Sequence, residues 1–220
     1  MPVVKTIFGL FAVTILCLGC GAGGDGATVQ VNEEALMNPD SPDMKQTAPV
    51  EFRAKFETSA GDFVVDVKRE LSPNGVDRFY NLVRTGYYNE QRFFRVLPGF
   101  VVQWGMHGNP EVTAKWHNAS IPDDPVVGSN TPGTITFAKT NMPNSRTTQL
   151  FINLGDNGRN LDGQGFSAFG TITEGMEAVQ AINAEYGQNP NQQRIGEKGN
   201  KYLNKLFPNL DYIKSAYILE

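Results

Sequence analysis

The chain has 220 residues, enough for one domain that buries roughly 70% of the surface that the unfolded chain exposes. It carries 19 Lys and Arg against 23 Asp and Glu, a formal net charge of −4, and no run of basic residues. Proteins that bind the phosphate backbone are typically basic, with clustered Lys and Arg, so composition argues against nucleic acid as a partner.

Residues 1–20, MPVVKTIFGLFAVTILCLGC, are predicted to be a signal peptide. One cation, Lys5, precedes about a dozen mostly apolar residues, a run shorter than a membrane-spanning helix needs. Both cysteines, Cys17 and Cys20, lie in this stretch, so the rest of the chain contains no cysteine for a disulfide.

Cys20 follows Leu18 and Gly19 at the end of the apolar run, which resembles the lipobox of bacterial lipoproteins. The resemblance implies that Cys20 is lipidated, which would anchor an exported protein to a lipid bilayer in the cell envelope, on the periplasmic side; two or more acyl chains anchor stably. Gly21 is not the aspartate that marks inner-membrane retention in some Gram-negative bacteria, so the outer membrane is expected. Because Cys17 stands where these signals usually have leucine, ordinary cleavage to a soluble exported protein remains the alternative.

Residues 21–50 are predicted to be a flexible linker. The segment lacks sustained periodicity, carries five acidic residues against Lys45, and contains few large apolar side chains. Such a composition favours a solvated chain. The folded domain is therefore expected to cover residues 51–220.

Short alternating segments predict β-strands along most of that domain. In the first two segments, which meet at Ala60 and Gly61, Phe63, Val65 and Val67 share one face, as expected of a hairpin. The eight predicted strands cover residues 52–59, 62–69, 92–97, 100–105, 133–138, 149–154, 167–172 and 211–219.

Two segments predict helices instead. Ser72 at the N-cap and Pro73 at the first helical position begin a helix that ends at Gly86; the second covers roughly residues 174–183. Residues 185–209 are polar and predict a long surface loop. Many short strands and two helices indicate a mainly β protein, a closed antiparallel barrel rather than a parallel α/β sheet.

Three stretches resemble the cyclophilin family of peptidyl-prolyl isomerases in order and spacing: residues 93–103 (FFRVLPGFVVQ), 133–154 and 160–170 (NLDGQGFSAFG). The match extends over Lys55–Glu220 and is of the bacterial type. It implies an eight-stranded antiparallel barrel capped by two helices, with the site on its outer face.

The resemblance also implies the site residues. Arg95 corresponds to the catalytic arginine, with Phe100 and Gln103 beside it. The residues implied to bind substrate are Val101, Ala138, Lys139, Gln149, Phe151, Leu161 and Phe166. Val101, Lys139, Asn160 and Phe166 depart from residues common in the family, so sensitivity to cyclosporin is not implied.

Elementary chemistry also favours an arginine as the catalytic group and apolar residues as the substrate-binding surface. Rotation about an X-Pro bond disrupts amide resonance across a barrier of about 18–20 kcal/mol, but breaks no bond, so it requires no nucleophile, metal or cofactor. It is helped by a donor for the twisted amide and an apolar recess for the ring. Arg95 is a permanently charged donor, and the aromatic and aliphatic residues form the recess.

Other interpretations of the same residues remain open. Arg95 could be an exposed strand residue paired with Glu90, Phe100, Phe151 and Leu161 could be core residues, and Gln103 and Gln149 could be polar strand faces. His107 and His117, without nearby cysteines, do not indicate a metal site.

The prediction is an exported monomeric peptidyl-prolyl cis-trans isomerase that acts on proline-containing unfolded or flexible polypeptides and assists the folding of exported proteins. The alternative is a low-activity peptide-binding or scaffolding module on the same fold.

Overall fold

The computed structural model describes residues 31–219. Cys20, the predicted signal peptide and the start of the predicted linker lie outside this range. All eight predicted strands are present and form one antiparallel sheet in the order β3-β4-β6-β5-β7-β2-β1-β8. Their bounds are Glu51–Thr58 (β1), Phe63–Lys68 (β2), Arg95–Leu97 (β3), Val101–Trp104 (β4), Thr134–Phe137 (β5), Leu150–Asn153 (β6), Ala168–Glu174 (β7) and Ile213–Leu219 (β8).

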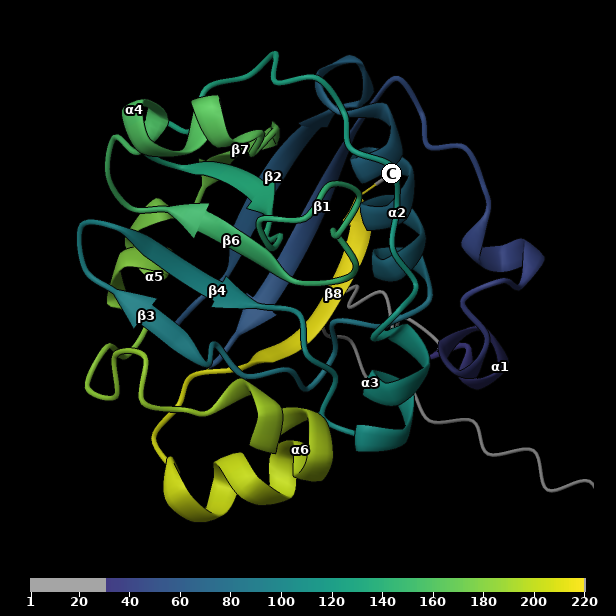
Figure 1. The fold of residues 1–220 in the computed structure, drawn as a ribbon. Helices are drawn as coiled ribbons and strands as arrows, with labels where there is room; N and C mark the ends of the chain where they lie inside the picture. The colour runs from purple at the N-terminus through teal and green to yellow at the C-terminus, as the bar shows by residue number, and fades with distance from the viewer. Residues whose placement is uncertain (1–30, 220) are drawn as a thin grey trace, which may run out of the picture.

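The sheet is strongly curled, as Figure 1 shows, but its two edges do not form a continuous ladder. An isolated bridge between Arg92 and Tyr212 and a few backbone hydrogen bonds, such as that from the Phe93 N–H to the Asp211 carbonyl oxygen, join the segment before β3 to the start of β8. The prediction of an antiparallel eight-stranded sheet is confirmed, whereas complete closure of the barrel is not. The sheet is a half-barrel because, with Arg92 opposite Tyr212 in an antiparallel register, β3 begins beyond the residues that face β8.

Helices cover the sheet and its ends. The two predicted helices are confirmed as α2, Pro73–Arg84, and α5, Met176–Ala181. The described part of the chain also contains α1, Glu33–Met37, α3, Pro110–Trp116, α4, Gly158–Leu161, and α6, Gln192–Leu206. Within residues 31–219 no helix is long and apolar enough to cross a bilayer.

The prediction of a surface loop over residues 185–209 is wrong, because α6 occupies most of it. The Asn191 side chain caps the helix by accepting from the Arg194 N–H at 3.0 Å. Ile195, Tyr202 and Leu203 are buried in a small apolar cluster with Phe94 and Leu210. Ile195, Tyr202 and Leu203 are spaced as i, i+7 and i+8, which places them on one helical face. The segment nevertheless reads as a loop in the sequence, because most residues between them are polar and Gly199 interrupts the helical backbone.

Residues 33–48 also differ from prediction, since they pack on the domain instead of forming a solvated linker. Ala35, Leu36, Met44 and Ala48 are buried. The Trp116 indole donates to the Leu36 carbonyl oxygen at 2.8 Å, which ties α1 to α3. The apolar residues of this segment are isolated in the sequence, so only the complementary surfaces of α2 and α3 show why they are buried.

We predict that Leu36→Ala lowers the free energy of unfolding by about 2–3 kcal/mol, because it removes a fully buried side chain and leaves a cavity. Met37→Ala is the matched control, since Met37 is the next residue of α1 and is exposed. Urea unfolding of both variants measures the difference. Equal stability of the two variants would show that the segment does not contribute to the folded domain.

The N-terminus of α2 is capped by a distant residue. Ser72 occupies the N-cap position as predicted, but its side chain makes no capping hydrogen bond. Instead its hydroxyl donates to Asp124 at 2.6 Å, and Asp124 accepts from the backbone N–H groups of Asn74 and Gly75. The buried Arg146 donates to the same Asp124 carboxylate at 2.9 Å.

Alternation along the strands separates the core from the outer face. On β4, Val102 and Trp104 belong to the main core, whereas Val101 and Gln103 point to the other side. On β6, Ile152 is in the core and Phe151 lies on the outer face beside β4. The sheet therefore presents the predicted site residues together on its outer face.

Candidate active site

A chain of hydrogen bonds links three side chains across neighbouring strands. Arg95 on β3 lies opposite Gln103 on β4, and its Nη1 donates to Gln103 Oε1 at 3.1 Å. Gln103 Nε2 in turn donates to Gln149 Oε1 at 2.9 Å. The antiparallel register of β3 and β4 brings these groups together, and Gln103 holds the guanidinium in one orientation.

The guanidinium of Arg95 lies over an aromatic ring and has no acidic partner. Its central carbon is 5.5 Å from the centre of the Phe100 ring, and within residues 31–219 no carboxylate lies within ion-pair distance of it. Glu90, the partner considered from the sequence, pairs with Arg92 instead. Partial burial lowers the pKa of Arg95, but arginine has so high an ordinary pKa that it stays charged in proteins.

Beside the guanidinium is an apolar cluster separate from the main core. Val101, Phe151 and Leu161 are buried in it, with the half-buried Phe100, Ala138 and Phe166 around them. The Phe151 and Phe166 rings meet edge to face at 5.9 Å. These residues are thus not part of the main core, although they are of core types.

Lys139 and Phe166 form one rim of this cluster. The Lys139 ammonium lies 5.4 Å from the centre of the Phe166 ring and donates to the Gln164 carbonyl oxygen at 3.0 Å. Asn160 is exposed nearby, on α4. The structure therefore brings all the predicted substrate-binding residues to one patch. Of the departures from the family, Lys139, Asn160 and Phe166 lie at its rim, whereas Val101 is buried inside the cluster.

A hydrogen-bond network that no sequence motif indicated holds this rim in place. Asp162 accepts hydrogen bonds from Ser129, at 2.6 Å, and from the backbone and side chain of Asn130. Asn130 also donates to the Phe166 carbonyl oxygen at 2.8 Å. Partial burial raises the pKa of Asp162, but these hydrogen bonds outweigh it, so the pKa lies below its ordinary value. The network fixes the segment that carries Leu161 and Phe166 against β5 and β6.

Next to the glutamines is a depression of about 280 Å³. Its lining includes Gln103, Gln149 and Lys139, and also His117 from the end of α3 and Gln192 from the start of α6. Gln192 was missed because its segment reads as a loop in the sequence. Within the described range no group of three His, Cys, Asp or Glu residues could hold a metal ion.

The arrangement suits recognition of an amide beside an apolar ring. Only one N–H of the Arg95 guanidinium is hydrogen-bonded to the described residues, so the others can reach a ligand placed on the apolar cluster. A fixed, charged donor beside an apolar surface stabilises a developing lone pair or oxygen dipole more than water does.

Comparison with known proteins supports one family. A family model described as "Cyclophilin type peptidyl-prolyl cis-trans isomerase/CLD" matches residues 53–198. Among curated proteins, peptidyl-prolyl cis-trans isomerase B of Escherichia coli is 35% identical over 134 residues, covering 58% of this chain and 81% of that protein. Peptidyl-prolyl cis-trans isomerase cyp18 of Streptomyces antibioticus is 35% identical over 135 residues, with the same coverage of each chain.

Solved structures agree on the fold. A cyclophilin type peptidyl-prolyl cis-trans isomerase of Cryptosporidium parvum has a TM-score of 0.59 at 19% identity, over 77% of this chain and 98% of that one. The same protein, in the presence of the dipeptide Ala-Pro, has a TM-score of 0.58 at 20% identity, over 76% and 99% of the two chains.

Proposed function

Because the chain belongs to the cyclophilin type peptidyl-prolyl cis-trans isomerase family, we propose that it catalyses rotation about X-Pro peptide bonds at the patch around Arg95. The observation that carries this proposal is the Arg95 guanidinium, held by Gln103 beside the cluster of Val101, Phe151 and Leu161. The substrates are proline-containing unfolded or flexible polypeptides.

The proposed mechanism follows from the electronic change in the amide. When the X-Pro bond twists, resonance is lost and the nitrogen regains a lone pair. The proline ring packs on the apolar cluster while Arg95 donates to the twisted amide. Gln103, which orients Arg95, can also hold a backbone carbonyl or N–H of the substrate. Catalysis then consists of binding the twisted amide more tightly than either planar isomer.

The expected rate acceleration has two sources, the charged donor and the contacts made with the twisted amide. A preorganised donor contributes about 3–4 kcal/mol, or about 10²–10³ in rate, since each 1.36 kcal/mol is tenfold. Any further acceleration comes from contacts that the apolar cluster and the depression make only with the twisted conformer.

The test is a proline-isomerisation assay on short X-Pro peptides. We expect the relaxation rate to rise in proportion to protein concentration above the uncatalysed rate, which corresponds to tens to hundreds of seconds. A peptide that binds but relaxes at the uncatalysed rate would favour the alternative, a binding or scaffolding module. A panel with different residues before proline would then define the preferred substrate.

We also propose that the protein is exported and anchored through a lipid on Cys20, acting as a monomer on exported polypeptides in the cell envelope. The support is the sequence pattern up to Cys20. Cys20→Ser is expected to move the protein from the membrane fraction to the soluble fraction, or to leave an unprocessed precursor with its apolar segment intact. A processed Cys20→Ser protein that remains in the membrane fraction would contradict anchoring through this residue.

A further inference from the structure

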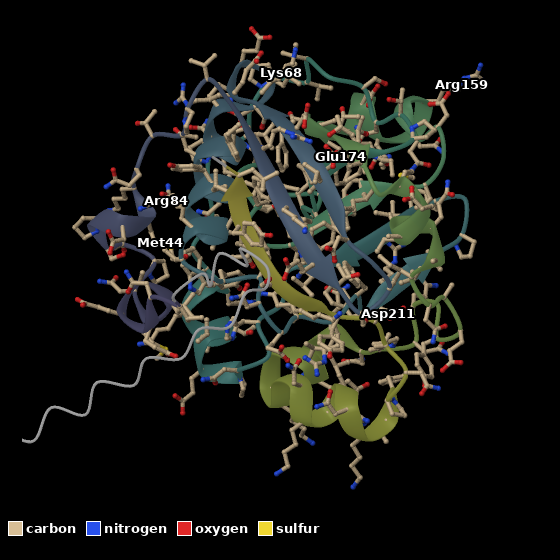
Figure 2. All side chains as sticks on the ribbon, turned by 180° about the vertical axis from the view of Figure 1, so that it is seen from behind. Met44, Lys68, Arg84, Arg159, Glu174 and Asp211 are labelled. Carbon is tan, nitrogen blue, oxygen red and sulfur yellow. The ribbon has the colours of Figure 1, made fainter. Side chains whose placement is uncertain are left out.

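Helix α6 carries four cations that form no ion pair with the described residues. Arg194, Lys198, Lys201 and Lys205 are spaced by four, three and four residues and are all exposed. None of them forms an ion pair with another residue of the 31–219 range. In Figure 2, side chains ending in nitrogen project from the ribbon of α6 away from the sheet. Two or three other residues separate these cations in the sequence, so they form no basic run there. In the folded helix all four line the same hollow. We call these four residues the basic face.

A bend in α6 shapes this face into a hollow. Gly199 has φ 54° and ψ −144°, outside the helical region, and its Cα lies against the Gly108 carbonyl with no room for a Cβ. The Asn200 N–H donates to the same carbonyl oxygen at 2.9 Å, which fixes the bend. The resulting hollow measures about 580 Å³, with Tyr202 and Leu206 among its lining.

The basic face does not belong to the active site. Gln192 lines the depression beside Gln103, but Arg194 lies about 200° further around the helix, at about 100° a residue. Around the helix axis, the buried Ile195 lies between Gln192 and Arg194 and so separates the two faces. A short peptide confined to the isomerase site would therefore not contact the basic face.

We propose that the basic face docks on an anionic lipid bilayer. Clusters of four or more Lys and Arg on a helix are typical of binding to anionic headgroups. Leu206, at the end of the face, is 50% exposed and can enter the interfacial region. Glu197 is the acidic residue in the hollow, and Gln193 donates to it at 3.0 Å.

The position of the predicted anchor favours a bilayer over other anions. Only 11 peptide steps separate Cys20 from Val31 (31 − 20), which span at most about 40 Å, comparable with the diameter of a domain of this size. The chain then enters α1, which contacts α3, and α3 contacts α6. This inference rests on the anchoring proposed above: an anchored domain would stay near the bilayer, and docking through α6 would leave the isomerase site open.

The test uses residues 21–220, the processed chain without its lipid. Neither acyl chains nor the apolar segment before Cys20 then contributes to vesicle binding. Partition is measured by sedimentation with phosphatidylcholine vesicles containing or lacking phosphatidylglycerol. Lys198→Gln with Lys201→Gln is expected to lower partition to the anionic vesicles about 25-fold, since each cation near a charged surface contributes about fivefold. Partition to neutral vesicles should not change.

The matched control is Lys68→Gln with Lys214→Gln, which removes the same charge from two exposed lysines on β2 and β8. It should retain most of the anionic partition. An equal loss in both double variants, or no loss in either, would overturn the proposal. Binding through Lys198 and Lys201 to polyglutamate or a DNA oligonucleotide but not to vesicles would overturn it too. Isomerisation of a short X-Pro peptide should be the same in both variants, which separates this outcome from failure of the proposed enzyme function.

Discussion

Arg95→Ala is expected to lower kcat/KM for X-Pro isomerisation by about 10²–10³, because it removes the charged donor that Gln103 holds beside the apolar cluster. The side chain is half-buried and makes one hydrogen bond, to Gln103, so its removal should affect catalysis much more than stability. The measurement is the isomerisation rate of an X-Pro peptide with wild-type and variant protein at several concentrations.

Two further variants separate charge from geometry. Arg95→Lys keeps the charge but loses the planar fork, so its rate should fall between those of Arg95→Ala and the wild type. Arg53→Ala removes an exposed arginine on β1 that pairs with Asp66 and Glu174, and should leave the rate unchanged. If Arg95→Ala isomerised as fast as wild type, the proposed role of the guanidinium would be wrong.

Arg146→Met is expected to cost about 3–5 kcal/mol of unfolding free energy, because it leaves the buried Asp124 carboxylate without its cation. The two side chains are 1% and 3% exposed, with nitrogen and oxygen 2.9 Å apart. Arg146 also donates to the Ser72 hydroxyl and to the Pro122 carbonyl oxygen. One side chain therefore joins the start of α2 to the segment that precedes β5, and urea unfolding measures its contribution.

Replacing both partners tests whether the loss comes from the unpaired charge. Arg146→Met with Asp124→Leu should recover part of the stability, since apolar pairs often replace buried ion pairs at little cost. Recovery will be incomplete, because Asp124 also caps α2 through Asn74 and Gly75. A double variant as unstable as the sum of the two single variants would mean that the charges do not interact.

The same carboxylate predicts a dependence of stability on pH. Burial raises the pKa of Asp124, but hydrogen bonds from Ser72, Gly75, Asn74 and Arg146 outweigh it and lower the pKa below its ordinary value. The ionised form therefore stabilises the folded state above the unfolded-state pKa of about 3.9, and this contribution is lost as the pH falls through the lower folded-state value. Asp124→Asn should lack that part of the acid dependence.

Local sequence patterns were sufficient to predict much of the fold and the residues that make up the candidate site. Alternation predicted all eight strands, and Pro73 with its helical period predicted α2, because each pattern is contained in one element. The motif around Arg95 placed Phe100 and Gln103 within one hairpin, where register alone sets their distance. The match over residues 133–170 supplied Gln149, Phe151, Leu161 and Phe166, which the folded sheet brings to the same face.

The tertiary structure decided what depends on contacts between distant segments. Burial of Leu36 requires α3, the bend at Gly199 requires the Gly108 carbonyl, and the cap of α2 comes from Asp124 about 50 residues away. The incomplete closure of the sheet and the basic face of α6 are of the same kind. No local pattern encodes them, because burial, capping and charge clustering depend on which surfaces meet in space, whereas periodicity reports only which face of one element is apolar.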